Sequence, residues 1–433
     1  MSIHSQAGDR RALAITESGG AEPPGLNAVA GPPSGIEHRG TVIDPFIAHL
    51  PSPTFARIDL AAFRHNIEVV RSFVSPGTGI LAMVKANAYG HGMLAIAAEA
   101  AAAGVEFFGI ARVEEGAELR QAGFAQRILL LELASGDRAL AAIRLGLEIT
   151  VASLSQATEL NALARQLGRP AFVHVEIDTG MGRTGFDHAR AAAEIEEISG
   201  LQHVILAGVF SHFASSDDPD QSFAHEQLKR FNGVLARLER QGVRVPLRHC
   251  ANSGAIMTLP QAHFDMVRVG IMLYGYVSAN GMDTAGLAPV MSLHSSVGFI
   301  KTVEAGTPIS YDHRYVTPHR SRIATVLIGY GDGFSRRQTT GAEALIRGRR
   351  YPVVGTICMD MIMVDVGLED EIAVGDTVTL IGDDGKERIT AWDVARRTGT
   401  IPYEVTCQVA ERVPRLFVNA SVSRGGISTL VSR

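Results

Sequence analysis

Residues 79–111 read GILAMVKANAYGHGMLAIAAEAAAAGVEFFGIA, and this stretch decides the fold. It begins with a short apolar run at 79–85, closed by Lys85, which predicts a buried strand. An Ala-rich segment at 93–103 follows with the period of a helix and ends at a glycine. A second apolar run at 107–111 predicts the next strand. The order strand, helix, strand is that of one unit of a parallel α/β sheet.

The same alternation continues along the chain. Further runs typical of strands lie at 127–133, 147–152, 172–177, 204–210, 247–251 and 265–269, and helical patterns lie between several of them, as at 113–121 and 222–241. About eight strand–helix units in roughly 220 residues predict a closed (β/α)₈ barrel of the TIM type better than an open sheet.

The pattern changes near residue 288, after which helices almost disappear. Apolar runs typical of strands lie at 291–303, 323–328, 351–356, 361–366 and 377–381, with one helical pattern at 391–398. Turn-forming clusters separate the runs, which predicts a mainly antiparallel β domain. We therefore expect a barrel over 54–288 and a C-terminal β domain over 289–433. Residues 1–53 hold seven of the chain's 18 prolines and show no lasting period, as in a flexible extension.

Composition limits the possible partners. The chain has 433 residues, 46% of them apolar, and a net charge of -5, so nothing indicates binding to nucleic acid or to an anionic membrane. Cys250, Cys358 and Cys407 form no CxxC pair, which favours reduced thiols in a cytoplasmic protein and no metal site. We find neither a secretory signal nor an apolar run of the roughly 18–20 residues that span a membrane.

The chemistry centres on VKANAYGHG at 84–92. A lysine that closes a barrel strand lies at the carboxyl end of the barrel, where active sites are found. Desolvation there can lower the pKa of Lys85 and make it a nucleophile, although for a lone lysine a solvated strand end would be the better interpretation. The nonapeptide as a whole resembles the cofactor-lysine motif of the alanine racemase family.

The resemblance extends from about residue 54 to about residue 416. Eight further motifs resemble those of the family and occur in the same order: DTGMGRTGF (178–186), SHFASSD (211–217), HCANSGA (249–255), MVRVGIMLYG (266–275), PISYD (308–312), IGYGDG (328–333), GTICMDM (355–361) and IPYEVTC (401–407). Each string alone is weak, but eight in order over both domains are specific. They imply a pyridoxal-phosphate enzyme that interconverts L- and D-alanine. The sequence leaves open whether this reaction supplies D-alanine for peptidoglycan or serves the catabolism of D-alanine.

Racemisation needs a base on each face of the substrate's Cα. The resemblance assigns Lys85 to one face and Tyr311 to the other, with Tyr311 contributed by the second subunit of a homodimer. His212 matches the residue that links this tyrosine to Arg268. Arg268 matches the arginine that faces the pyridine nitrogen, where a cation disfavours protonation of the ring and so limits side reactions.

Other matched positions imply contacts with the cofactor and the substrate. The cofactor contacts include hydroxyl groups and a glycine-lined backbone suited to a phosphate; they are Tyr89, Arg183, His212, Asn252, Ser253, Arg268, Gly270, Ile271 and Tyr403. The substrate carboxylate is expected at Arg183 and Met359, and Tyr330 with Tyr403 should narrow the entrance to admit a small side chain.

Two positions depart from the family pattern. Many members carry a carbamate-modified lysine two residues before the DTG aspartate, where this chain has Glu176; we expect Glu176 to orient Arg183 as a permanent carboxylate. Asp312 stands where a glycine usually follows the catalytic tyrosine. Its negative charge should oppose an ionised Tyr311 unless the carboxylate points away.

Three other functions stay open from the sequence. A racemase of broad specificity would act on serine or larger amino acids. A different pyridoxal-phosphate reaction, such as decarboxylation, is disfavoured by Arg268 and Tyr311. A non-catalytic cofactor carrier would generally lack the second domain that this chain has.

Overall fold

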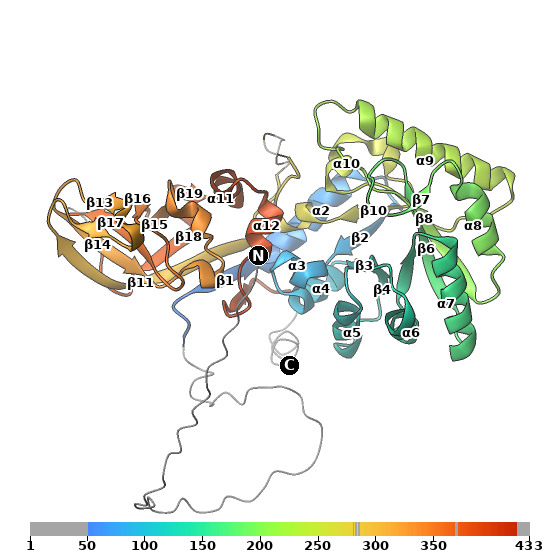
Figure 1. Ribbon diagram of the computed structural model, residues 1–433, viewed down its shortest axis with the longest axis horizontal. Coiled ribbons are helices and arrows are strands. Elements are labelled where there is room, and N and C mark those ends of the chain that lie inside the picture. The colour runs from blue at the N-terminus through green and yellow to red at the C-terminus, as the bar shows by residue number, and fades with distance from the viewer. Residues whose placement is uncertain (1–50, 280, 282–283, 285, 369–370, 422–433) are drawn as a thin grey trace, which may run out of the picture. The chain divides into compact units, whose positions relative to one another are not determined.

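The structure, a computed structural model, describes residues 51–279, 281, 284, 286–368 and 371–421. The extension predicted for 1–53 lies almost wholly outside the described residues. The described chain forms two large sheets, one parallel and one mainly antiparallel (Figure 1).

The parallel sheet is the predicted barrel. Its strands, in spatial order, are β10 (Met266–Val269), β2 (Gly79–Met83), β3 (Phe107–Ile110), β4 (Arg127–Leu130), β5 (Glu148–Val151), β6 (Ala171–Asp178), β8 (Val204–Phe210) and β9 (Arg248–His249). Every hydrogen-bonded neighbour in this order is parallel. The backbone of β9 and β10 closes the ring, because the amides of Asp265 and Arg268 donate to Arg248 O and Ala251 O at 3.1 and 2.9 Å.

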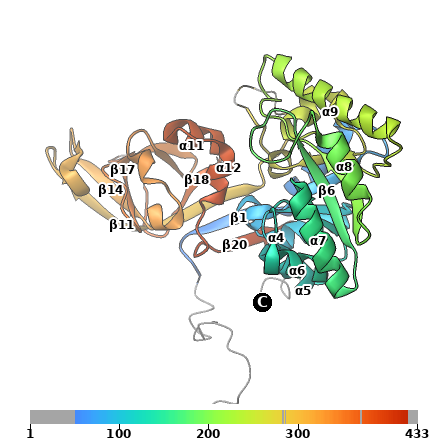
Figure 2. The ribbon, with the colours of Figure 1, turned by 45° about the vertical axis from the view of Figure 1, so that its right-hand side comes forward.

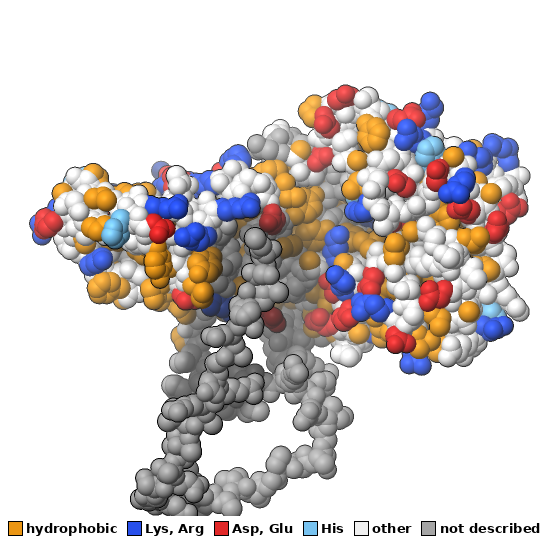
Figure 3. All heavy atoms as spheres, in the orientation of Figure 1, with side chains coloured by type: hydrophobic (Ala, Val, Ile, Leu, Met, Phe, Trp, Pro, Cys, Tyr) orange, Lys and Arg blue, Asp and Glu red, His pale blue; other side chains and the backbone are white. Residues whose placement is uncertain are grey.

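Helices cover the outside of these strands (Figures 1 and 2). They are α2 (Leu60–Phe73), α4 (Met93–Ala102), α5 (Val113–Gln121), α6 (Gly136–Arg144), α7 (Leu154–Leu167), α8 (Ala191–Ser199), α9 (Ser222–Arg240) and α10 (Ser253–Thr258). Local signals set their ends. In α7, the Ser153 side chain caps the first turn, and Gly168 ends the helix at φ 62°. On the face drawn in Figure 3, cationic and anionic side chains alternate over these helices, in line with the small net charge.

The second sheet contains the C-terminal strands and one strand from the start of the described chain. Its order is β19 (Glu387–Ile389), β18 (Thr377–Asp384), β15 (Glu343–Ile346), β16 (Arg349–Val354), β17 (Ile362–Gly367), β14 (Ser321–Val326), β11 (Met291–Val303), β1 (Phe55–Asp59) and β20 (Arg415–Val418). All neighbours are antiparallel except β1 and β20. The predicted fold class, a TIM-like barrel followed by a mainly antiparallel β domain, is confirmed.

Some short elements were not predicted. β1 lies in the second sheet, between β11 and β20, so the strand that precedes the barrel pairs with the C-terminal part of the chain. A helix, α12 (Pro402–Cys407), follows the predicted α11 (Ala391–Thr398), and a two-stranded ribbon joins β12 (Pro308–Ile309) to β13 (Tyr315–Val316). These segments are too short to show a period, and the partners of β1 lie far away in the chain.

Candidate functional site

A cavity of about 220 Å³ lies at the carboxyl ends of the barrel strands. It is lined by all ten residues for which the sequence predicted cofactor contact, together with three further apolar ones: Met83, Lys85, Tyr89, Leu131, Arg183, Phe210, His212, Asn252, Ser253, Arg268, Gly270, Ile271 and Tyr403. The fold thus brings together residues that are more than 300 positions apart in the chain, as the numbers of Lys85 and Tyr403 show.

The turn that carries Lys85 is strained. Ala86, Asn87, Ala88 and Tyr89 all have φ near 53°, a left-handed conformation that costs an L-residue about 1–2 kcal/mol each. Such a turn persists only when its surroundings hold it. Here Glu115 accepts the Ala86 amide at 2.6 Å, and the Asn87 side chain accepts the amide of the next helix, at Met93, at 2.7 Å.

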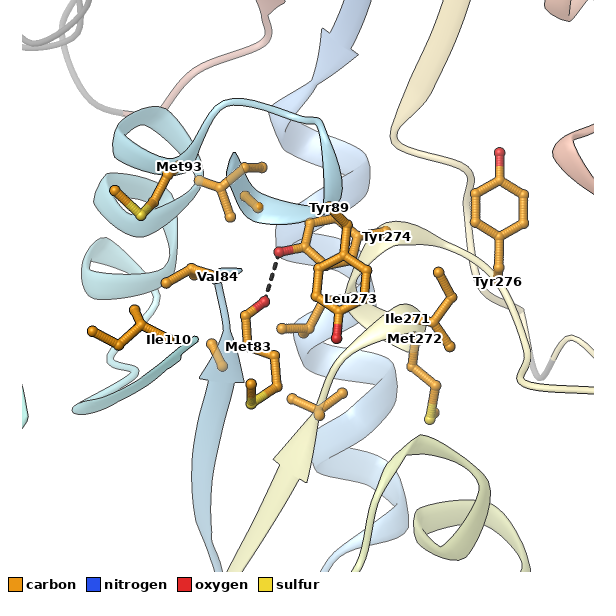
Figure 4. Close-up of a cluster of buried hydrophobic side chains, with 14 of the residues drawn as sticks. Met83, Val84, Tyr89, Met93, Ile110, Ile271, Met272, Leu273, Tyr274 and Tyr276 are labelled. Atoms are coloured by element: carbon orange, nitrogen blue, oxygen red, sulfur yellow. Dashed lines mark hydrogen bonds between the residues drawn. The ribbon is translucent and has the colours of Figure 1, made fainter. Parts of the chain in front are cut away.

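Aromatic side chains pack against this turn and against the end of β2 (Figure 4). The Tyr274 hydroxyl donates to the Met83 carbonyl at 2.7 Å, which anchors the end of β2 two residues before Lys85. The ring of Tyr274 lies 4.8 Å from that of Tyr89 and 4.5 Å from that of His91. The strand end and the turn therefore share one buried aromatic cluster.

Lys85 itself is half-buried at the cavity wall. Its pKa is lowered, first by burial and then by the nearby cation of Arg183. A lowered pKa increases the fraction of neutral amine, the form that attacks a carbonyl or takes up a proton.

Hydroxyl groups gather on another side of the cavity. Burial raises the pKa of the Tyr89 and Tyr403 phenols, so both stay protonated as donors, and neither has a hydrogen-bond partner among the described residues. Ser253 Oγ accepts the Gly270 amide at 3.1 Å. A Cβ at Gly270 would lie 2.7 Å from Tyr89 Oη, so only glycine keeps this approach open.

Arg268 is buried and held by neutral acceptors. Its two terminal nitrogens contact the carbonyls of Ser211, His249 and Cys250 and the Nδ1 atoms of His212 and His249, at 2.7–3.3 Å. Its pKa is lowered to about 10, chiefly by burial, which still leaves a cation at neutral pH. Burial, and next the Arg268 cation, lower the pKa of His212 well below the usual range, so this imidazole is neutral.

The loop after β6 contributes Arg183. Its Nη2 lies 3.6 Å from Glu176 Oε1, and Glu176 Oε2 accepts from the Thr184 hydroxyl at 2.6 Å. Glu176 is buried, whereas the Arg183 side chain is 54% exposed. A buried and hydrogen-bonded carboxylate thus lies beside an exposed cation.

The remaining predicted residues form a second group, on the β domain. Tyr311, Tyr330 and Met359 are 66, 41 and 53% exposed, and none of them lines the Lys85 cavity of the same chain. Backbone and side-chain bonds hold the group together: the Tyr330 amide donates to Cys358 O at 3.0 Å, and Thr356 Oγ1 donates to Tyr311 O at 2.9 Å.

The loop that presents Tyr311 is also strained. Ser310, Asp312 and His313 have φ of 66, 61 and 50°. Asp312 does not act as an isolated charge beside Tyr311, because its Oδ2 lies 3.7 Å from Arg314 Nε and 3.8 Å from Arg336 Nη2. The positive charges of Arg314 and Arg336 therefore offset the negative charge of Asp312, which the sequence analysis expected to oppose an ionised Tyr311.

Some site residues were missed by sequence reasoning. Met83, Leu131 and Phe210 line the cavity, and each lies at or just after the end of a barrel strand, a signal that could have found them. In the part of the chain that the structure describes, no group of three or more His, Cys, Asp or Glu side chains is placed to hold a metal ion. Nor does any described helix combine the length and apolarity of a membrane crossing.

Comparisons with known proteins agree with this arrangement. Residues 58–278 match the family model of the alanine racemase N-terminal domain, and residues 290–417 match that of the alanine racemase C-terminal domain. The chain belongs to the alanine racemase family. Similar relatives are the alanine racemases of Desulfovibrio desulfuricans (44% identical over 84% of this chain and 98% of the relative) and Symbiobacterium thermophilum (43%, 84% and 97%).

Solved structures of the alanine racemase family share the fold. The alanine racemase of Clostridium difficile 630 superposes with a TM-score of 0.82 at 38% identity, covering 86% of this chain and 97% of its own. That of a D-cycloserine-producing Streptomyces lavendulae has a TM-score of 0.82 at 36% identity, covering 86 and 98%. The resemblance stated from sequence motifs is therefore confirmed.

Proposed function

We propose that this protein is an alanine racemase that interconverts L- and D-alanine with pyridoxal phosphate at the Lys85 cavity. One observation carries the proposal: a half-buried lysine of lowered pKa, a buried arginine and a set of neutral hydroxyl donors line one small cavity. The two family models, which cover both domains, support the same reaction.

The residues present fit the cofactor. A phosphate needs donors without other partners, and the hydroxyls of Tyr89 and Tyr403 are of this kind among the described residues. The bare backbone of Gly270 lies between Ser253 and Tyr89, in a space that a Cβ would fill. We infer that these groups, with the Ile271 amide and the Asn252 side chain, bind the phosphate end, and that Lys85 binds the aldehyde end.

Once bound, pyridoxal phosphate would withdraw electrons from the substrate's Cα and so acidify its proton. Lys85 Nζ takes or returns that proton on one face, since its lowered pKa keeps a share of the amine neutral. Arg268 remains a cation at neutral pH and would disfavour protonation of the cofactor's ring nitrogen. Arg183 binds the substrate carboxylate, helped by the Met359 amide.

Tyr311 supplies the second base, from the other subunit of a homodimer. Two observations support this arrangement: Tyr311 is absent from the cavity lining of its own chain, and its side chain is exposed on a loop held in a strained conformation. A site with one base is incomplete for racemisation, and a twofold dimer would complete both sites symmetrically. His212 Nδ1 already accepts from Arg268, so its Nε2 is the atom left to meet the incoming phenol.

Glu176 makes a modified lysine unnecessary in this chain. Its carboxylate is buried, held by Thr184, and within 3.6 Å of Arg183. We expect Glu176→Gln to reduce kcat/KM for alanine by about tenfold, because a neutral amide holds a cation less well. Adding bicarbonate to the wild-type enzyme should have no effect. Full activity of the Gln variant would contradict this role.

The test of the function uses purified protein loaded with pyridoxal phosphate, incubated with L- or D-alanine in deuterated water. We expect both enantiomers to reach the same mixture, with deuterium at Cα, read by chiral chromatography and mass spectrometry. Exchange with retained configuration would mean that Tyr311 does not act. A panel with serine, lysine and arginine tests specificity, and faster turnover of these would favour the broad-specificity alternative.

A further inference from the structure

A column of polar side chains crosses the barrel interior behind Arg268. We call Arg127, Glu148, His174 and His249 the column. Arg127 Nε and Nη2 donate to the two oxygens of Glu148 at 2.5 and 2.8 Å. Glu148 Oε2 lies 2.6 Å from His174 Nε2, and His174 Nδ1 lies 2.8 Å from His249 Nε2. The last contact, from Arg268 Nη1 to His249 Nδ1, measures 3.0 Å.

Only one arrangement of protons satisfies every contact. An ionised Glu148 can only accept, so His174 carries its proton on Nε2. Neutral His174 then accepts at Nδ1 from the Nε2–H of His249. That leaves the Nδ1 lone pair of His249 for Arg268, which can only donate. If His174 carried two protons, His249 would turn an N–H towards the guanidinium.

Burial keeps both histidines in this neutral form. Burial lowers the pKa of His174 and, together with the Arg268 cation, lowers the pKa of His249 well below its usual range. Burial alone would raise the pKa of Glu148, but hydrogen bonds from His174 and Arg127 outweigh it and lower the pKa, which keeps the carboxylate ionised.

The barrel backbone is shaped to admit the column. A Cβ at Gly208 would lie 2.6 Å from His174 Nδ1, so a side chain there would displace the imidazole. The pairing of β6 with β8 shifts register at the same point, between Val173 and His174. At the inner end, the ring of Phe210 stacks on His249 at 4.9 Å. These features show a column that is built into the core.

The terminal nitrogens of Arg268 are fully occupied by hydrogen bonds, in part to His249 of the column. Nη1 and Nη2 carry four N–H groups for five acceptors, two of which belong to His249. The Nε–H of Arg268 has no acceptor among the residues described, and Arg268 lines the cavity.

We propose that Glu148, through His174 and His249, is a positioning residue that holds Arg268 with its Nε–H free for the ring nitrogen of the cofactor. The inference rests on the proposed function, because it concerns the same cavity. Glu148 does not line the cavity, and its hydrogen-bonded path to Arg268 runs through His174 and His249.

The test is a Glu148→Gln variant with Glu106→Gln as its matched control. Glu106 is exposed at the same end of the barrel, next to Arg127. A glutamine at 148 must turn its NH₂ either to Arg127 or to His174, so a donor meets a donor in both cases. We expect a shifted absorption band of the bound cofactor and a kcat lower by about tenfold with KM changed less than about threefold, because Arg268 is misplaced. The control should change neither.

A second variant, Glu148→Leu, removes the acceptor altogether and should produce an equal or larger change; thermal unfolding of each holoenzyme reports its folding. Folded Gln and Leu variants with wild-type absorption and wild-type kcat would overturn the positioning role. A lower melting temperature without a spectral change would overturn it as well, since it would reveal a purely structural role. A wild-type protein that does not racemise alanine would instead refute the proposed function.

Discussion

Most site residues of the barrel are buried or half-buried, whereas Tyr311, Tyr330 and Met359 of the β domain are exposed. On the barrel, Arg268 is buried and paired on both terminal nitrogens, and a hydrogen-bonded column continues behind it. On the β domain, Tyr311 is exposed, its loop is strained, and the nearby Asp312 is paired with exposed cations. The difference teaches that the barrel holds its polar groups in a preorganised pocket, whereas the β domain holds its groups exposed, as the proposed action of Tyr311 on a second subunit requires.

The largest effect should follow from removing the barrel base. Lys85→Ala should lower the rate of alanine racemisation by about 10⁴-fold, because both the cofactor link and one proton acceptor are lost. The assay is chiral chromatography of alanine. Lys229→Ala, on the surface of α9, is the control and should keep the wild-type rate. An active Lys85→Ala enzyme would place the chemistry elsewhere.

A somewhat smaller loss is expected on the β domain. Tyr311→Phe should lower racemisation by about 10²- to 10³-fold, since one face of Cα loses its base while the pocket is intact. Dimers reconstituted from Lys85→Ala and Tyr311→Phe chains should regain about a quarter of the wild-type activity, because half of the dimers would carry one complete site. No recovery on mixing would mean that each site uses residues of one chain only.

Acid should unfold the barrel through its buried histidines. Burial lowers the pKa of His91 to about 4 and also lowers the pKa of His174, so the unfolded chain takes up protons near pH 6.5 while the folded chain does not. Stability therefore falls as the pH drops below about 6.5. Urea unfolding between pH 7 and 5 measures the slope. A His91→Asn variant should show a shallower slope, and an unchanged slope would contradict the assignment.

The smallest predicted effect is a loss of stability on adding a methyl group next to His174 of the column. Gly208→Ala should destabilise the fold by about 1–3 kcal/mol, because its Cβ would overlap His174. Gly233→Ala, on the exposed face of α9 with nothing within 4 Å, should stabilise it by up to about 1 kcal/mol. Urea unfolding compares the two. Equal stability of both variants would show that the barrel core can relax around the added methyl group.

Local patterns predicted much of the fold. The period of apolar residues correctly predicted α5, β8, β11 and α11 to the residue, because a helix or strand that buries one face must repeat its apolar positions. The motifs identified the family and named the cavity residues, but through resemblance and not through geometry. Local patterns failed at β1 and β20, two short strands that pair with each other from opposite ends of the described chain, and at the six-residue helix α12, which is too short to show a period.

The sequence by itself therefore determined the family and most of the order of strands and helices, since local periods and short motifs carry this information. Only the tertiary structure decided that Tyr311 stands apart from the cavity of its own chain, and that Glu148 reaches Arg268 through two histidines. The reason is physical: His174 and His249 are 75 positions apart, and their hydrogen bond exists only because parallel strands place both rings inside one barrel.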